Sequence, residues 1–189
     1  MPCRGSVRGK IDPEPAGLYL IGAMNPPQRH PLPIARRLIL LPLAAGFLWL
    51  GLAPGAAQLA SFPTAELTIA TASGSHKFKV EVATSPEQLE QGLMFRRSLA
   101  PDAGMVFDFK APQPVMMWMK NTLIPLDMLF VDQQGRIINI HERAVPGSLD
   151  PIAATAPARA VIELNGGTAA HLGIKPGDRV TFPIFGNAS

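Results

Sequence analysis

Apolar and polar residues alternate in short runs from residue 66 to residue 184, and turn-forming residues separate the runs. The clearest run is residues 77–82, in which Phe78, Val80 and Val82 alternate with charged residues. A period of two is typical of a half-buried β-strand, and turn signals every roughly 8–12 residues are typical of a β-sandwich or barrel. The pattern predicts strands at residues 66–71, 77–82, 105–109, 115–120, 126–131, 136–141, 160–164 and 179–184.

Turn residues predict two hairpins and two short helices. Ser73-Gly74-Ser75 separates the first two strands, and Asp132-Gln133-Gln134-Gly135 separates residues 126–131 from 136–141, with Gly135 suited to a positive φ. Ser85, followed by a proline and then Gln88, predicts a capping box and a helix that ends near Gly92. A one-turn helix is expected from Thr168, its predicted cap, to Gly173. The predicted fold is mainly β: one antiparallel β-sandwich or barrel, jelly-roll-like, with one or two short helices.

The N-terminal segment has the pattern of an export signal. Arg29, Arg36 and Arg37 form a basic region, and residues 38–53 are uncharged and strongly apolar. This run is too short for a comfortable membrane span, and small residues follow it up to Ala57, where we expect cleavage. The predicted localisation is periplasmic or secreted, by general secretion, with no stable membrane span after cleavage. Retention of the run as a short anchor and burial as a core helix are the alternatives.

These boundaries divide the chain into residues 1–57, a lead-in at 58–65 and one β-rich domain at 66–186. Translation could also begin at Met24, which opens a more ordinary basic region than residues 1–23 do. The only cysteine is Cys3. Removal of the first segment would therefore leave a protein without a disulfide, a thiol nucleophile or a cysteine metal ligand.

Charge is unevenly distributed along the chain. The whole sequence has a formal net charge of +3, but residues 58–189 hold 11 Lys and Arg against 12 Asp and Glu. A nearly neutral domain lacks the electrostatic footprint of a nucleic-acid-binding protein. Neither a phosphate-binding glycine loop nor a Gly-x-Ser-x-Gly nucleophile motif is present in the sequence. No cofactor and no nucleic-acid partner are expected.

Several motifs occur in a specific order along nearly the whole predicted domain. They are Gly92-Leu93-Met94-Phe95-Arg96, Gly104-Met105-Val106-Phe107, Trp118-Met119-Lys120-Asn121-Thr122, Pro125-Leu126-Asp127 and Val161-Ile162-Glu163-Leu164-Asn165-Gly166-Gly167, with Gly173 and Gly177-Asp178 after them. In these motifs the chain resembles the domain of unknown function 192 family over residues 66–185. Gly166-Gly167 and Val106 depart slightly from the usual pattern. The resemblance implies a β-rich, jelly-roll-like or barrel-like fold and frequent export. It implies no established activity, so the catalytic residues are unknown.

The first candidate site is the polar group between residues 118 and 127. Trp118, Lys120, Asn121, Thr122 and Asp127 place a cation, an amide, a hydroxyl and a carboxylate in an otherwise apolar stretch. Such a set could bind a polar ligand, or hold Asp127 as a general base. The structural alternative is that Asp127 accepts hydrogen bonds from the Asn121 and Thr122 backbone amides and fixes the turn.

The second candidate site combines Arg96, Arg159 and Glu163. Arg159 and Glu163 are expected on one face of a strand, and Arg96 is expected to approach either Glu163 or Asp127. Arginine among carboxylates is suited to clamping an anion or a carboxylate. The structural alternative is an ordinary ion pair at the surface or rim of the domain, which would contribute little stability.

Methionine and histidine give weaker signals for a metal. Thioethers favour Cu(I), but Met117 and Met119 are expected to point away from Met116, as in a packed core. Met94, Met105 and Met128 are the other methionines considered as thioether ligands. His76, His141 and His171 lack the close spacing of zinc ligands, so no metal site is predicted.

Three functions remain open on the sequence alone. The favoured hypothesis is an exported domain that binds a small polar or carbohydrate-like ligand or an envelope component. A hydrolase acting through Asp127 or Glu163, with Lys120 or Arg96 stabilising negative charge, is the second. An assembly protein that presents apolar surface to an envelope partner is the third.

Overall fold

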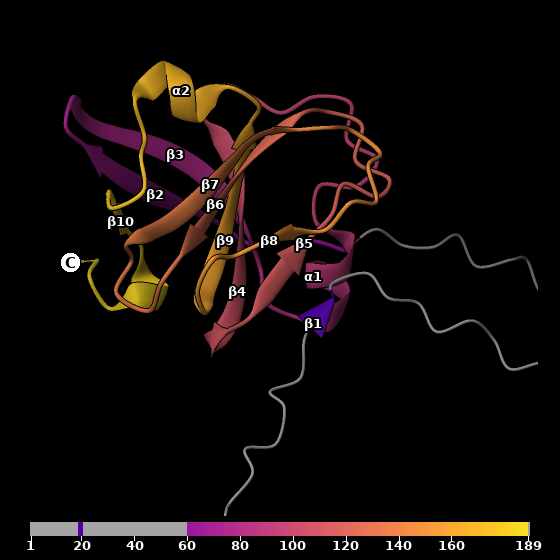
Figure 1. Ribbon diagram of the computed structural model, residues 1–189, viewed down its shortest axis with the longest axis horizontal. Coiled ribbons are helices and arrows are strands. Elements are labelled where there is room, and N and C mark those ends of the chain that lie inside the picture. Colours follow the sequence, from indigo (N-terminus) through magenta and orange to yellow (C-terminus); the bar gives the residue numbers. More distant parts are fainter. Residues whose placement is uncertain (1–18, 21–59, 189) are drawn as a thin grey trace, which may run out of the picture.

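A computed structural model describes residues 19–20 and 60–188 of the chain (Figure 1). The predicted signal features at Met24, Arg29, residues 36–53 and Ala57, together with Cys3, lie outside the described residues. The strands are β1 (Tyr19–Leu20), β2 (Thr64–Thr71), β3 (Gly74–Ala83), β4 (Ala103–Gln113), β5 (Val115–Met117), β6 (Leu126–Val131), β7 (Ile137–Ala144), β8 (Ile152–Ala153), β9 (Ala158–Asn165) and β10 (Arg179–Thr181). The helices are α1 (Pro86–Gln91), α2 (Thr168–Leu172) and the 3-10 turn η1 (Pro183–Phe185).

A curled, seven-stranded sheet forms most of the described structure. Its strand order is β10-β2-β3-β4-β9-β6-β7, and a smaller sheet has the order β1-β5-β8. Within the large sheet β3 and β4 are parallel, and the other neighbouring strands are antiparallel. The predicted mainly β fold with short helices is confirmed as a half-barrel, with one parallel strand pair in it.

The strands β6 and β9 of the large sheet are buried on both faces. Every residue of β6 is buried, and in β9 only the last residue is not. Because neighbouring side chains in a strand point to opposite faces, the two strands contribute to two separate cores. Val106 and Ile162 belong to the core that α2 covers, whereas Met105 and Val161 belong to the core beside α1 and the small sheet. In Figure 1 the two helices lie at opposite sides of the view.

The local sequence signals with a clear physical cause are confirmed. The Ser85 hydroxyl accepts a hydrogen bond from the Gln88 backbone amide, and the Gln88 side-chain oxygen accepts one from the Ser85 backbone amide, which completes the capping box. Helix α1 ends at Gly92. The hairpin of β6 and β7 turns through Gly135, which has φ of 80°.

Three predicted elements differ from the structure. Strand β5 ends at Met117 rather than residue 120, because the chain turns there and Asn121 has a positive φ of 57°. The last predicted strand, 179–184, is interrupted after residue 181 by η1, which begins at Pro183. Helix α2 has Gly167 as its N-cap, with no side-chain cap bond, so the predicted cap role of Thr168 is wrong. Strand β8 was not predicted.

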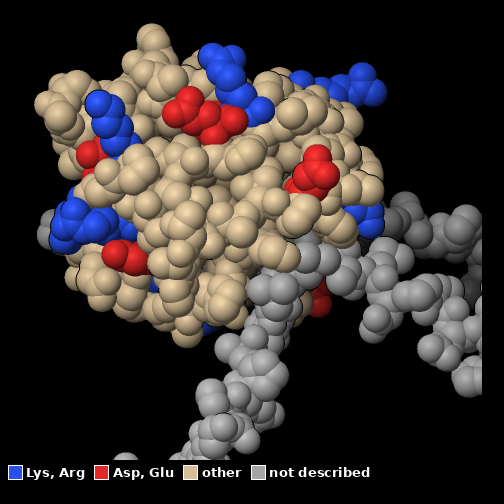
Figure 2. All heavy atoms as spheres, in the orientation of Figure 1, with Lys and Arg blue, Asp and Glu red and all other residues tan. Residues whose placement is uncertain are grey.

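Acidic and basic side chains are interspersed over the face in Figure 2, as expected from the near balance of charge in residues 58–189. None of the helices in the described part of the chain is long and apolar enough to cross a membrane.

Candidate functional site

Asp127 lies in β6 and is fully buried. Its Oδ1 accepts hydrogen bonds from the backbone amides of Arg143 and Gly167, and its Oδ2 accepts one from Ala169, each at 2.8 Å. A carboxylate saturated by three amides and closed to solvent is a structural element, and the amides of Asn121 and Thr122 predicted to bind it do not do so.

The partners of Asp127 come from two distant, irregular segments. In β7 the register against β6 shifts between Leu126 and Met128, and Arg143 in this irregular stretch has φ of 51°. After β9 the chain turns through Gly166 and Gly167. A Cβ atom on Gly166 would lie 2.9 Å from Pro125 Cβ, and Gly167 has φ of 94°, so both positions require glycine.

Arg96 pairs with Glu81 of β3. Its Nη1 and Nη2 donate to the two carboxylate oxygens of Glu81 at 2.6 Å each, and its guanidinium lies 5.9 Å from the centroid of the Phe62 ring. The expectation that Arg96 approaches Glu163 or Asp127 is therefore wrong. The planar guanidinium of Arg96 and the carboxylate of Glu81 match each other with two parallel hydrogen bonds, and such a partly buried bidentate pair is favourable.

Arg159 pairs with Asp108 of β4 instead of Glu163. The Arg159 guanidinium contacts the Asp108 carboxylate, and Lys110 Nζ lies 3.1 Å from the other oxygen of that carboxylate. Arg159 and Asp108 are both buried, so this ion pair belongs to the interior rather than to the surface or rim. Asp108 lies where the register between β4 and β9 becomes irregular, which sequence spacing does not indicate.

Glu163 is the one predicted carboxylate that faces a cavity. It lies in β9 and is 4% exposed, and it lines a narrow pocket of about 20 Å³ together with Trp118 and Thr122. Burial raises the pKa of the Glu163 carboxyl to about 8, and no hydrogen bond within the described residues offsets this effect. A desolvated acid in a cleft is a candidate functional group.

Lys120 and Asn121 lie at the turn beside this pocket. The Lys120 ammonium is 5.1 Å from the centroid of the Trp118 ring, a cation–π contact made across a turn rather than along a strand face. Asn121 is exposed, and its carbonyl accepts a hydrogen bond from the Phe95 amide at 2.9 Å. Of the eight predicted site residues, three thus line one pocket and Lys120 lies next to it.

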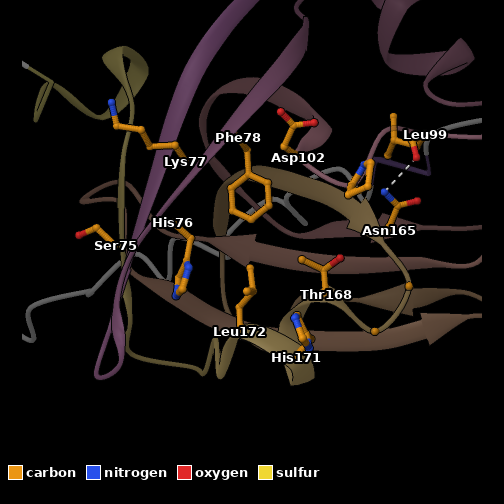
Figure 3. A pocket seen from close by; sticks show the side chains of 13 residues that line it. Ser75, His76, Lys77, Phe78, Leu99, Asp102, Asn165, Thr168, His171 and Leu172 are labelled. Atoms are coloured by element: carbon orange, nitrogen blue, oxygen red, sulfur yellow. Dashed lines mark hydrogen bonds between the residues drawn. The ribbon is translucent and has the colours of Figure 1, made fainter.

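A larger groove, which was not predicted from the sequence, lies between β3 and α2 (Figure 3). It has a volume of about 740 Å³ and contains none of the predicted site residues. Its floor includes buried Phe78 and half-buried Leu172. Asn165 fixes one wall, because its side chain donates to the carbonyls of Leu99 and Ala100. The groove is also lined by His76, Lys77, Asp102, Thr168 and His171.

The buried methionines pack in a core, and the histidines form no metal-ligand cluster with Cys, Asp or Glu in the described residues. Met105, Met117, Met119 and Met128 are buried in the core beside α1, as core packing requires. In the part of the chain that the structure describes, no group of three His, Cys, Asp or Glu side chains could hold a metal ion.

Comparison with known proteins finds uncharacterised relatives. The DUF192 family model, described as Uncharacterized ACR, matches residues 68–182. A crystal structure from Sinorhizobium meliloti 1021, described as a "putative transcription regulator", is 51% identical, with a TM-score of 0.64 over 66% of this chain and 98% of that chain. A second crystal structure, of a protein of unknown function from Novosphingobium aromaticivorans, is 44% identical, with a TM-score of 0.63 over 70% of this chain and 94% of that chain. No curated protein is matched.

Asp127→Asn is expected to lower the free energy of unfolding by about 3 kcal/mol, because the new amide group must face one of three buried N–H donors. Asp132→Asn is the matched control. Asp132 also accepts hydrogen bonds from two backbone amides, those of Gln134 and Arg136, and both go to Oδ1. Asparagine retains that oxygen. Urea denaturation measures both variants. Equal, small losses would contradict the structural role of Asp127.

Glu163→Gln is expected to remove a pH dependence of stability. The pKa of Glu163 is raised on folding, so the unfolded carboxyl ionises first and stability is lost as the pH rises from about 4.5 towards 8. The wild-type unfolding free energy should fall by roughly 1 kcal/mol per pH unit in this window relative to Glu163→Gln. Urea denaturation at several pH values measures the difference. Exposed Glu142→Gln should follow the wild type, and parallel curves for Glu163→Gln and wild type would contradict the prediction.

Proposed function

Because this chain belongs to the DUF192 family, whose description assigns no activity, we propose from the geometry that the protein binds a small, neutral, polar ligand of the carbohydrate type in the groove between β3 and α2. The observation that carries the proposal is a groove of about 740 Å³ with an apolar floor and a polar rim. This volume is within the range of small-molecule sites.

The rim offers hydrogen-bonding groups from separate parts of the fold. His76 comes from β3, Asp102 from the turn before β4, and Thr168 and His171 from α2. Figure 3 shows these side chains around Phe78 and Leu172. Converging donors and acceptors above an apolar surface suit a sugar, which has hydroxyl groups on its edges and C–H groups on its faces.

The charges at the rim favour a neutral ligand over an ion. Lys77 and Asp102 bring one charge of each sign, and Lys77 already pairs with Glu66 at 2.8 Å. A groove without an excess of either sign gains little from binding an anion or a cation. The near balance of charge in residues 58–189 also gives no support to nucleic acid as the ligand, in spite of the description of the Sinorhizobium relative.

Catalysis through Asp127 has less support than binding. Its carboxylate is buried and holds three backbone amides, so proton transfer to a substrate would first require those bonds to break. The groove itself holds His76, His171 and Asp102, and the hydroxyl that contacts His76, that of Thr71 at 3.3 Å from Nε2, does not line the groove.

A neutral sugar is expected to stabilise the protein against unfolding. The full chain would be titrated with glucose, maltose, N-acetylglucosamine and its dimer, and melting temperature and heat of binding would be measured. Saturation at 100 times the dissociation constant adds about 2.7 kcal/mol to stability. His171→Ala and Asp102→Ala should each weaken binding by about tenfold, the loss of roughly one good hydrogen bond.

His141→Ala is the matched control for the groove. His141 is an exposed histidine on β7 and does not line the groove, so its replacement should leave affinity unchanged. A sugar panel without a saturable response, or equal losses in His141→Ala and His171→Ala, would contradict the proposed site.

We also propose that the domain acts outside the cytoplasm. The support is the basic residues Arg36 and Arg37 before the apolar run 38–53. Protein recovered by osmotic shock from producing cells should begin at Gln58 when its N-terminus is read by mass spectrometry. Leu40→Arg, which places a charge in the apolar run, should leave the chain uncleaved inside the cell. Wild-type chain that retains residues 24–57 in the cytoplasm would contradict export.

A further inference from the structure

The narrow pocket at Glu163 lies apart from the groove and differs from it in chemistry. It is enclosed by α1, by the turn that follows β5 and by β4 and β9. Its volume of about 20 Å³ has room for one water-sized group, since such a group needs roughly 10–15 Å³. Its lining residues are Leu89, Glu90, Gln91, Gly92, Leu93, Phe107, Met117, Trp118, Thr122 and Glu163.

The pocket lining carries acidic side chains and no basic side chain. Glu163 lies at the buried end, and Glu90 of α1 is exposed, whereas Lys, Arg and His are absent from the lining residues. Phe107 and Trp118 supply aromatic walls, and aromatic faces attract cations. The Trp118 ring already holds one ammonium group, that of Lys120, at 5.1 Å from its centroid.

Glu163 lacks a partner within the described structure. It is 4% exposed, and desolvation alone governs its ionisation, with no hydrogen bond or neighbouring charge contributing. The other buried carboxylates of the sheet are satisfied: Asp127 by three amides and Asp108 by Arg159 and Lys110. A buried acid without a partner is costly, and a ligand that supplies one would recover part of that cost.

We propose that this pocket binds the ammonium group of a small primary amine, with the Glu163 carboxylate as its counter-ion. The ammonium has three N–H donors, and Glu163 together with the Thr122 hydroxyl offers acceptors at the inner end. Thr122 retains this capacity because its hydroxyl donates its own proton to the Lys120 carbonyl at 3.4 Å.

The size and composition of the pocket select against other cations. Calcium and magnesium ions take six or more oxygen ligands, and this lining has two carboxylates, one of them at the exposed rim. A quaternary ammonium exceeds a space of about 20 Å³. Binding does not depend on the groove, so the two proposals stand or fall separately.

The test uses the fluorescence of Trp118 in the full chain carrying Trp49→Phe, which leaves Trp118 as the only tryptophan. Ethylammonium chloride would be titrated against sodium chloride at constant ionic strength. Saturable quenching is expected, with affinity rising about tenfold per pH unit from pH 6 to pH 8, because one proton leaves Glu163 for each amine bound. The amine itself stays protonated to about pH 10.

Variants and competing ions separate the pocket from general cation binding. Glu163→Gln should weaken binding at least tenfold at pH 8 and remove the pH dependence, while Glu142→Gln should behave as the wild type. A cooperative melting curve for Glu163→Gln shows that it is folded. Glu90→Gln should weaken amine binding less than Glu163→Gln does, because the Glu90 side chain is exposed whereas Glu163 is buried.

Three results would overturn the proposal. They are an absence of saturation, binding to Glu163→Gln with wild-type affinity and pH dependence, and equal displacement by potassium or tetramethylammonium. Equal displacement would indicate a site for any monovalent cation rather than for a primary amine.

Discussion

The carboxylate of Asp127 connects β6 with two other segments of the chain, at residue 143 and at residues 167–169. It accepts amides from Arg143 in the irregular end of β7, from Gly167 after β9 and from Ala169 in α2. A charge buried this completely requires donors on both oxygens, so those backbone segments have one permitted arrangement. The position of α2 follows from it, and α2 forms a wall of the large groove. The groove therefore depends on a residue that does not line it.

The three buried acids of the sheet differ in whether their carboxylates have partners. Asp127 has backbone donors, and Asp108 has Arg159 and Lys110. Glu163 has burial without either kind of partner, and its pKa is raised to about 8 as a result. Two of the three carboxylates thus have hydrogen-bond or ionic partners in the sheet, whereas the third has none within the described residues.

Local order was predictable from the sequence because its causes lie within a few residues. The capping box at Ser85 and the turn at Gly135 depend on neighbouring groups, and both are confirmed. The partners of charged side chains were not predictable, because they depend on which strands become neighbours. Arg96 meets Glu81 across 15 residues, and the parallel pairing of β3 with β4 has no local signature. The groove was missed for the same reason: its walls come from three separate segments.

Strand β9 carries both proposed sites at one end, on different sides of the sheet. Glu163 points towards the core beside α1, Leu164 points towards the opposite core, and Asn165 fixes the wall of the groove. Because β9 is hydrogen-bonded to β4 on one side and β6 on the other, its end is held more rigidly than a loop would be. Binding in one site could influence the other only by displacing this central strand, which would disturb both ladders and the turn that Asp127 fixes. The fold therefore favours two independently acting sites over a coupled pair.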